Sequence, residues 1–530
     1  MSRAAGPQAP SAKNAHGQYF TPGNIANLMV SMLVSAPDTA ALEPSAGQGV
    51  FVEALLDAGF SDVQAVEIDA SLLTTSRAPV DHESFVSWQP DYRCGIAIGN
   101  PPYIRWKNLG EDQKDELRAS PYWGTLINSL SDYLNVFIIK TIQHLRTGGE
   151  LVFITPAFWM HTQHASLLRD FMLTQGVITD LVTFGESTVF PGVSSSVMIF
   201  RYVKTTDVPK TIRHYKYIGA RTVGTGPLKL DDSQRFELGE IPQFQRGSHW
   251  TLAAKGVHIH LAQHEMWTMG ASSEPRTIGG YCDIANGMVI GLDRAFRLPL
   301  EMLPLLTKRE TAAVTHVSKA ANLDVLFSGT TTPYIDIPPG LTESKVRDRY
   351  PHLIAHLEIH RDALDRRYSM KGVLPFWEWS FRRSEKMHKD ARRKLFVPCK
   401  ERLTNRTHPR FCFVPAGSVP TQDVTSVAPM PTTREAVEYI AAFLTLDEVA
   451  EWIRYRGLMK GGVAEFSERP LAAIPFRPVN WDDPCEVTTH SEIVKVVRAV
   501  EAGTTPTDAA LRDIHCLFER LGLTTTRQAS

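Results

Sequence analysis

The sequence predicts an α/β protein in which a doubly wound, mostly parallel sheet comes first and a separate α+β domain follows. Two observations lead to this prediction. Short apolar runs alternate with helical stretches from residue 20 to about 200, and the pattern then changes to short strands with many prolines and glycines. Alternating strands and helices are typical of a parallel sheet covered on both faces. A chain of 530 residues has room for two or three such domains.

The first half supplies the elements of this sheet in order. Thr21-Pro22 predicts a helix start, with threonine as the N-cap and proline in the first turn. Strands are then expected at 40–42, 63–68, 95–98, 150–155, 178–183 and 195–202, and helices at 50–58, 132–145 and 166–175. The last two strands are joined by a loop, so we expect them to form an antiparallel hairpin at the edge of the sheet.

The pattern after residue 204 predicts the second domain. It should extend over 205–480, with helices near 353–367 and 434–456. Residues 481–530 are expected to form a C-terminal helical extension built on the amphipathic stretches 491–502 and 508–521. The small, polar residues 1–15 are expected to be disordered.

The composition excludes several classes of protein. No apolar run reaches the ~18 residues of a membrane helix, and the N-terminus has no apolar core of a secretory signal. The six cysteines form no CxxC pair, which argues against a zinc ribbon or a disulfide framework and favours the reducing cytoplasm. Two groups of histidines lack the HExxH pattern, so we predict polar helix faces and no metal site there: His258, His260 and His264, and His352, His356 and His360.

A nucleoside site is indicated by the turn from Glu43 to Gly49, which connects a predicted strand to a predicted helix. Its small residues Ser45, Gly47 and Gly49 let a ligand approach the backbone at a helix N-terminus. Glu67 follows Gly47 by twenty residues at the end of the next strand, where a carboxylate can accept hydrogen bonds from both ribose hydroxyls.

A second motif, Asn100-Pro101-Pro102-Tyr103, follows the apolar strand at 95–98. The two prolines fix the backbone, so the Asn100 side chain and the Pro101 carbonyl can point rigidly at one place. Both are hydrogen-bond acceptors and together suit a planar NH₂ group. The Tyr103 ring adds a flat face for a base.

Charge is distributed unevenly along the chain. Residues 31–200 carry 19 acidic and 9 basic side chains, whereas residues 361–410 carry 15 basic and 6 acidic ones. Aromatic residues are interleaved with the basic ones, a pattern that fits either nucleic-acid contact or a solvated charged face. For nucleic-acid contact we expect phosphates to be bound by a set of five basic residues: Arg382, Arg383, Lys386, Arg392 and Arg393.

With these motifs the chain resembles the gamma class of adenine-N6 DNA methyltransferases of restriction–modification systems. The resemblance covers residues 16–203. It rests on the segment Tyr19–Pro22, the turn 43–49, Glu67, the tetrapeptide at 100–103 and the loop 185–193. The chain has Ser84-Phe85 where the family usually has Asp-Phe, so the family's contact to the adenine of the cofactor is altered here. In the second half the resemblance is fainter and concerns a target-recognition domain.

The resemblance implies a Rossmann-like catalytic domain at 16–204, a DNA target-recognition domain at 205–480 and S-adenosylmethionine as cofactor. It implies catalytic roles for Asn100, Pro101, Tyr103 and Phe190, the two aromatic residues stacking on a flipped adenine. Cofactor contacts are implied for Thr21, Glu43, Ser45, Gly47, Gly49, Glu67 and Pro102. The expected partners are double-stranded DNA and a separate restriction endonuclease, and the expected state is a monomer or weak dimer in a prokaryotic cytoplasm.

Three other functions remain open from the sequence. Enzymes that methylate a glutamine amide share the tetrapeptide, but they are shorter and place a helical domain before the glycine turn, whereas here the additional residues follow the catalytic half and include the basic segment. An RNA adenine or guanine methyltransferase would use the same site. An inactive DNA-binding modification subunit is the third, and the intact tetrapeptide argues against it.

Overall fold

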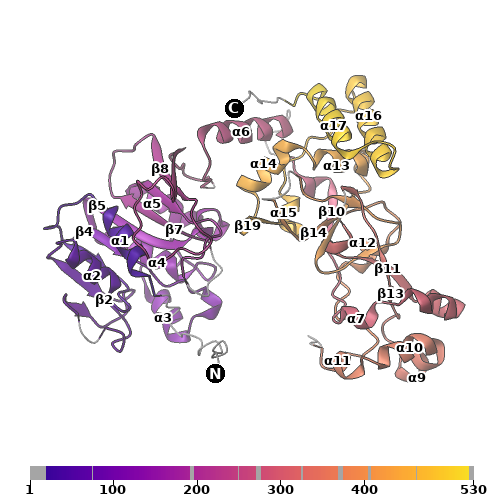
Figure 1. Cartoon of the computed structure of the whole chain (residues 1–530), viewed down its shortest axis with the longest axis horizontal. Helices are drawn as coiled ribbons and strands as arrows, with labels where there is room; N and C mark the ends of the chain where they lie inside the picture. The colour runs from indigo at the N-terminus through magenta and orange to yellow at the C-terminus, as the bar shows by residue number, and fades with distance from the viewer. Residues whose placement is uncertain are drawn as a thin grey trace, which may run out of the picture. The chain divides into compact units, whose positions relative to one another are not determined.

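The structure, a computed structural model, divides the chain into two compact units, Met1–Lys255 and Gly256–Ser530 (Figure 1). It describes residues 20–73, 76–190, 196–248, 250–269, 276–323, 326–367, 374–403, 408–460 and 462–523. The predicted disorder of 1–15 lies outside the described residues. All six cysteines are free. Within the described ranges, no helix combines the length and apolar character needed to cross a membrane.

The first unit is built on one large sheet. Its strands follow the order β3-β2-β1-β4-β5-β7-β6-β8-β9 among the described residues. They are β1 (Ala41–Glu43), β2 (Val63–Val66), β3 (Val80–Asp81), β4 (Cys94–Gly99), β5 (Leu145–Pro156), β6 (Val177–Thr183), β7 (Val197–Val203), β8 (Thr211–Tyr217) and β9 (Phe236–Pro242). β1 pairs in parallel with β2 and β4, and β4 pairs in parallel with β5, so the predicted parallel sheet is confirmed.

Helices cover both faces of this sheet. Ile96 and Ile98 of β4 belong to one buried cluster, with side chains of α1 (Gly23–Ser31) and α2 (Val50–Asp57). Ala97 between them belongs to a second cluster, with side chains of α4 (Tyr133–His144) and α5 (Ser166–Gln175). Successive strand residues thus face opposite helical layers, which confirms the doubly wound α/β class. The connections hold α3 (Glu111–Ala119) and the 3₁₀ turns η1 (Trp106–Asn108), η2 (Ala157–Met160) and η3 (Gln163–Ala165).

The hairpin of β6 and β7 forms as predicted, but it is not at the edge. β7 lies between β5 and β6 and is antiparallel to both. β8 then pairs in parallel with β6, and β9 pairs with β8. Because these two strands continue the first sheet, the first unit extends to Lys255 and the domain boundary predicted at 204 is wrong.

The second unit has α+β architecture with three smaller sheets, in the orders β10-β18-β14-β16-β12, β13-β11-β17 and β15-β20-β19 among the described residues. Its strands are β10 (Cys282–Asn286), β11 (Val314–Ser318), β12 (Phe327–Ser328), β13 (Thr332–Ile335), β14 (Leu395–Pro398), β15 (Lys400–Arg402), β16 (Cys412–Phe413), β17 (Val419–Pro420), β18 (Val424–Pro429), β19 (Met459–Lys460) and β20 (Val463–Glu465). The α+β prediction for this part of the chain is confirmed.

Helices surround these sheets. They are α6 (Lys255–Met269), α7 (Asp293–Phe296), α8 (Lys308–Thr311), α9 (Glu343–Arg349), α10 (Pro351–Glu358), α11 (Arg361–Asp365), α12 (Glu385–Lys389), α13 (Val437–Phe443), α14 (Asp447–Arg456), α15 (Glu468–Ala472), α16 (Pro484–Glu501) and α17 (Thr507–Arg520), with the 3₁₀ turns η4 (Ile278–Gly280), η5 (Leu300–Leu305) and η6 (Ala320–Asn322). The two helices predicted at 353–367 and 434–456 are each broken into two.

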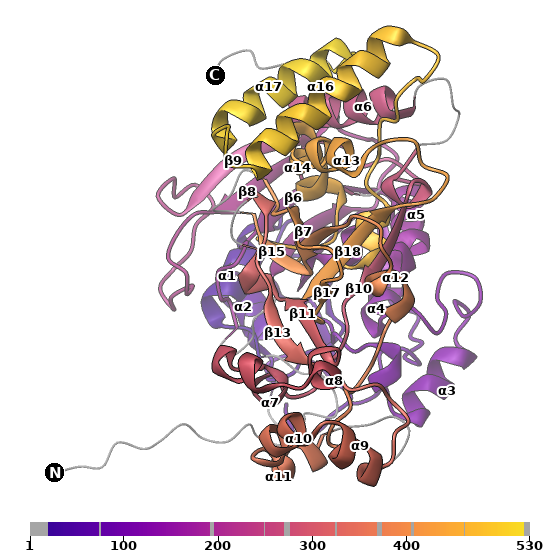
Figure 2. The ribbon, with the colours of Figure 1, turned by 90° about the vertical axis from the view of Figure 1, so that its right-hand side faces the viewer.

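The C-terminal helices α16 and α17 lie side by side (Figure 2) and are part of the second unit's core. Ile493 of α16 and Phe518 of α17 share a buried cluster with Tyr439 of α13. The indole of Trp267 in α6 donates to the carbonyl of Leu521 at 2.9 Å. The tail is therefore helical as predicted, but it is not a separate extension, because its apolar face completes this core.

One of the six histidines differs from the prediction of polar faces, and His352, which is exposed, agrees with it. His264 of α6 is buried against Trp267 and Phe443, and burial lowers its pKa to about 4. His352 contacts the buried Glu310 at 2.9 Å. In the described ranges, no three His, Cys, Asp or Glu side chains gather at metal-binding spacing.

Candidate functional site

A cleft of about 680 Å³, the open solvent at its mouth included, lies in the first unit where β1, β2 and β4 end. Ligands of open α/β sheets bind at the carboxyl ends of such strands. The cleft is lined by Phe20, Pro44, Ser45, Gly47, Glu67, Ile68, Ser84, Phe85, Asn100, Pro101, Pro102, Gln113, Tyr133 and Phe137. Six of the predicted site residues are among them: Ser45, Gly47, Glu67, Asn100, Pro101 and Pro102.

The glycine turn and Glu67 form one side of the cleft. Gly47 has a φ of +54° and borders open space, so a β-carbon there would be strained and would project into a region that no protein atom fills. The Glu67 carboxylate accepts the N–H of Gly47 at 2.7 Å and the N–H of Asp69 at 2.9 Å, one on each oxygen. Each oxygen keeps a further lone pair, so this fixed carboxylate can still accept a pair of hydroxyl groups. Gly49 ends the turn and is the N-cap of α2.

Glu43 ends β1 immediately before the lining residues Pro44 and Ser45. The residue is 1% exposed, and neither carboxyl oxygen has a well-formed hydrogen bond among the described residues, the backbone of Val52 supplying only a weaker contact. Burial raises the pKa of this carboxyl well above its ordinary value. An unsatisfied buried carboxyl next to a cleft marks a place where a hydrogen-bond donor is missing.

Asn100 connects three segments at the end of β4. Its side-chain Nδ2 donates to the Thr21 hydroxyl at 3.1 Å, and its carbonyl accepts the Ser45 hydroxyl at 3.3 Å. Thr21 is therefore not the side-chain N-cap of α1 as predicted. Pro22 occupies the N-cap position, and the threonine hydroxyl is used to orient the Asn100 amide.

Tyr103 lies beside Asn100, but neither Tyr103 nor Phe190 lines the cleft. The Tyr103 hydroxyl contacts Asn100 Oδ1 and the carbonyl of Ile154, the latter at 2.6 Å. Phe190 is 4% exposed in the cluster beneath α1 and α2. Residues 191–193 of the predicted stacking loop lie outside the described residues.

The described part of the loop 185–193 is hydrogen-bonded to the connection between β8 and β9. Thr188 accepts the N–H of Val223 at 3.0 Å and donates to the carbonyl of Arg221 at 2.8 Å. The Asn24 side chain in α1 donates to the carbonyls of Gly224 and Gly226 at 2.7 and 3.0 Å. The two strands that the sequence assigned to the second domain thus support the first unit's site.

Aromatic residues form one wall of the cleft, and the sequence analysis missed two of them, Tyr133 and Phe137. Phe85 packs on Phe137 with ring centroids 5.2 Å apart, and Phe137 packs on Tyr133 at 5.4 Å. Burial raises the pKa of the Tyr133 hydroxyl. The i,i+4 spacing of Tyr133 and Phe137 places both on one face of α4 and was the signal available in the sequence.

Known proteins similar to this chain identify its family. Residues 61–190 match the Eco57I restriction-modification methylase family. The type II methyltransferase M.HindII of Haemophilus influenzae is 36% identical, over 97% of this chain and 99% of its own length. The type II methyltransferase M.HincII of Haemophilus influenzae is 34% identical, with the same coverage. The chain belongs to the type II methyltransferases of restriction–modification systems.

The fold of this methyltransferase is also that of a larger enzyme. The structure of the type IIL restriction-modification enzyme MmeI in complex with DNA matches 96% of this chain and 73% of that chain, with a TM-score of 0.61. Sequence identity is 12%, so the match concerns the fold alone. Both units of the methyltransferase therefore have a counterpart in one solved fold.

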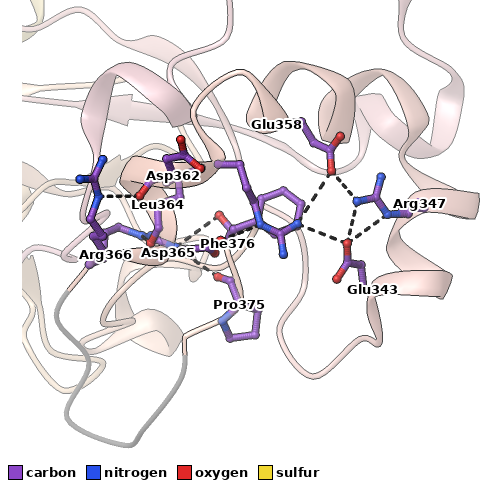
Figure 3. A network of polar contacts seen from close by, with 11 residues as sticks. Glu343, Arg347, Glu358, Asp362, Leu364, Asp365, Arg366, Pro375 and Phe376 are labelled. Carbon is purple, nitrogen blue, oxygen red and sulfur yellow. Dashed lines mark hydrogen bonds and ion pairs between the residues drawn. The ribbon is translucent and has the colours of Figure 1, made fainter.

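The basic segment of the methyltransferase's second unit, residues 361–410, is partly neutralised by carboxylates of the same unit. Figure 3 shows the network near its start, where Glu343 and Glu358 bind Arg347. Arg361 joins the same carboxylates and pairs with Asp365 at 2.8 Å. The excess of positive charge in the sequence therefore overstates what this surface presents to a partner.

Three of the five predicted phosphate contacts belong to such pairs. Arg382 pairs with the buried Asp336 and with Glu385, Arg392 with Asp283 and Asp390, and Arg393 with Glu438 and Glu501. Arg383 and Lys386 are exposed and form no ion pair among the described residues. The geometry thus separates the five predicted residues into three paired and two available cations.

Proposed function

We propose that this methyltransferase methylates the N6 atom of adenine in a short duplex DNA sequence, with S-adenosylmethionine as methyl donor. One observation carries the proposal. The acceptor pair of Asn100 and Pro101 lines the same cleft as the glycine turn and Glu67. An NH₂-binding pair beside a nucleoside-shaped site fits transfer from a nucleoside cofactor to an exocyclic amine.

The residues of the cleft fit S-adenosylmethionine. The open space beside Gly47 leaves room for the ligand to approach the protein backbone. Glu67 offers two fixed oxygens for ribose hydroxyls, and the poorly satisfied carboxyl of Glu43 offers an acceptor beside the turn. Phe85 and Phe137 offer an apolar wall for a purine ring. When bound, S-adenosylmethionine supplies an electrophilic methyl group on a sulfonium.

Asn100 and Pro101 would activate the substrate amine. The adenine amine is a poor nucleophile because its lone pair is delocalised into the ring. Acceptance of its two N–H bonds by Asn100 Oδ1 and the Pro101 carbonyl favours a pyramidal nitrogen and stabilises its developing positive charge. The Nδ2 bond to Thr21 fixes which end of the Asn100 amide faces the substrate.

Tyr103 would release this acceptor when the base arrives. Its hydroxyl contacts both Asn100 Oδ1 and the Ile154 carbonyl, so it can give up the first and keep the second. A duplex base must leave the stack to reach the site, at a cost of a few kcal/mol. Stacking on the Tyr103 ring would repay part of that cost. A matching role for Phe190 requires movement of its loop, because the ring is buried.

DNA is the proposed partner of the second unit, which would act as the target-recognition domain. Methylation would protect the recognised sequence from a separate restriction endonuclease. Membership in the restriction–modification family and the unpaired cations Arg383 and Lys386 support this assignment.

Expression in a methylation-free bacterial host followed by sequencing that detects modified bases tests the proposal. We expect N6-methyladenine at every copy of one short motif, and none with an Asn100→Ala variant. Methylated cytosine in place of adenine would contradict the adenine assignment. Methylation of RNA alone in a parallel assay with the purified enzyme and radiolabelled S-adenosylmethionine would contradict the DNA assignment.

A further inference from the structure

Lys140 is a buried lysine next to the cleft with no role in the mechanism above. It lies in α4 with 4% of its surface exposed and forms no ion pair among the described residues. Its Nζ donates to the carbonyls of Val86, at 2.8 Å, and of Trp88. The same Nζ lies 5.3 Å from the centre of the Phe85 ring. Burial of an ammonium group is costly unless hydrogen bonds or an ion pair offset the loss of water, and here the two carbonyls supply the hydrogen bonds.

The two hydrogen bonds of Lys140 and its contact with the Phe85 ring all involve one turn, residues 84–88. The turn is closed by the N–H of Trp88 on the carbonyl of Ser84 at 2.9 Å, and the Trp88 indole anchors it to Asp81 at 2.7 Å. In the described part of the chain, Lys140 is the hydrogen-bond donor to both the Val86 and the Trp88 carbonyl. Without it, two carbonyls of a partly buried turn would lose their protein partner.

This turn lines a part of the cleft whose role differs from that of Asn100. Ser84 and Phe85 line the cleft, and Phe85 packs on Phe137 to extend the apolar wall. Glu67 is suited to ribose hydroxyls, and Asn100 and Pro101 are suited to the substrate amine. The flat apolar wall that remains is the part of the cleft suited to a purine ring.

We propose that Lys140 is a positioning residue for the cofactor, holding the 84–88 turn in the shape that receives the adenine ring of S-adenosylmethionine. The inference rests on the cofactor proposed above. Lys140 does not touch the ligand and acts through Ser84 and Phe85. Its loss should therefore weaken cofactor binding without altering the amine-binding end of the site.

Lys140→Met tests this role, because methionine keeps the length of the side chain and removes the donor. We expect the KM for S-adenosylmethionine to rise about 10- to 100-fold, the cost of losing charge-assisted hydrogen bonds. The kcat at saturating cofactor and the affinity for DNA should stay within twofold of wild type. Binding of 5′-methylthioadenosine, which has the adenine and ribose but no amino acid, should fall by the same factor.

Lys204→Met is the matched control. Lys204 also donates to two carbonyls of this region, Ile142 at 2.9 Å and Leu145 at 2.8 Å, at the C-terminal end of α4, and neither residue lines the cleft. Its loss should lower the thermal midpoint and leave the KM for S-adenosylmethionine unchanged. Lys140→Arg, which keeps donors at this position, should restore part of the cofactor affinity.

Calorimetry of the wild-type protein with S-adenosylmethionine comes first. No binding there would contradict the proposed cofactor itself. If the wild type binds and Lys140→Met has the same KM as Lys204→Met, only the role of Lys140 is overturned. A parallel loss of cofactor affinity, kcat and DNA affinity would also overturn it, since that pattern indicates general misfolding. If Lys140→Met is insoluble, Lys140→Leu, which also lacks a donor, is judged by the same criteria.

Discussion

Asn100 uses the two ends of its amide for different tasks. Nδ2 is bound to Thr21, which leaves Oδ1 facing the Tyr103 hydroxyl that a substrate amine would replace. We predict that Asn100→Ala lowers methyl transfer by at least about 10²–10³-fold, the usual loss when a group stabilising a developing charge is removed. Cofactor affinity should be nearly unchanged. Assays of transferred label and calorimetry measure the two quantities, and activity within tenfold of wild type would contradict the assignment.

Glu67 should control cofactor affinity and leave the chemistry intact. We predict that Glu67→Ala weakens S-adenosylmethionine binding by about 10- to 100-fold, because charge-assisted hydrogen bonds to the ribose are lost. Glu67→Gln, which keeps one oxygen acceptor, should lie between wild type and alanine. Calorimetry that shows the same dissociation constant for all three proteins would remove Glu67 from the site.

The site residues that could be predicted are those whose positions follow from the order of the strands along the chain. Gly47, Glu67 and Asn100 each lie at or shortly after the end of a predicted strand, and parallel strands bring such ends to one edge. The bond from Asn100 to Thr21 joins residues 79 positions apart, and that from Lys140 to Val86 spans 54. No local pattern encodes a pairing at such distances, so both were invisible in the sequence.

At the scale of elements, Glu310 joins two helices of the second unit. Its carboxylate caps α8 through Thr307 and accepts the backbone N–H of His352 at the start of α10. Burial alone would raise its pKa, but hydrogen bonds from Thr307 and His352 outweigh burial and lower it to about 2. Because the folded pKa lies below the ordinary value near 4.5, the charged form stabilises the fold above pH 4.5.

We predict that Glu310→Gln destabilises the full-length protein by about 2–3 kcal/mol at pH 7. The difference from wild type should shrink as the pH falls from 4.5 towards 2, where the native carboxyl becomes protonated. Thermal midpoints measured across this range test it. Glu343→Gln, which alters an exposed carboxylate of the network in Figure 3, should show a smaller change. A gap for Glu310→Gln that is constant with pH would contradict the prediction.

Strands with strong local signals were predicted and those with weak signals were assigned wrongly. β4 is an unbroken buried run and β6 and β7 are nearly so. β8 and β9 are mostly exposed, with buried residues at only a few positions. Their place in the first sheet depends on pairing with β6, which the sequence does not display, and this error moved the predicted boundary.

At the scale of the whole molecule, the sequence contrasts an acidic first half with a basic segment. Ion pairs within the second unit, however, reduce the positive charge that this segment can offer to a partner. Arg382, Arg392 and Arg393 hold the second unit together. Charge counted along a sequence cannot distinguish such residues from free ones, because their partners are distant in the chain, as with Arg393 and Glu501. We therefore expect the unpaired cations of the segment to bind the phosphates.

Arg383 and Lys386 are the two predicted contacts that stay exposed and unpaired among the described residues. Ser384 between them has a φ of +47°, where the chain turns into α12. We predict that Arg383→Ala/Lys386→Ala weakens binding to all DNA sequences alike. The slope of log affinity against log salt should fall by about one unit for each true phosphate contact, since fewer counterions are released.

Arg392→Ala provides the contrast for this last prediction. It removes the same charge as one of those substitutions but breaks the pairs with Asp283 and Asp390. We expect it to lower the thermal midpoint and to leave the salt slope unchanged, since a paired guanidinium releases no counterions from DNA. Fluorescence anisotropy on duplex DNA at several salt concentrations separates the two variants. An unchanged slope for the double variant would show that the exposed pair is a solvated face, and phosphate contacts would then have to be sought in the rest of the second unit.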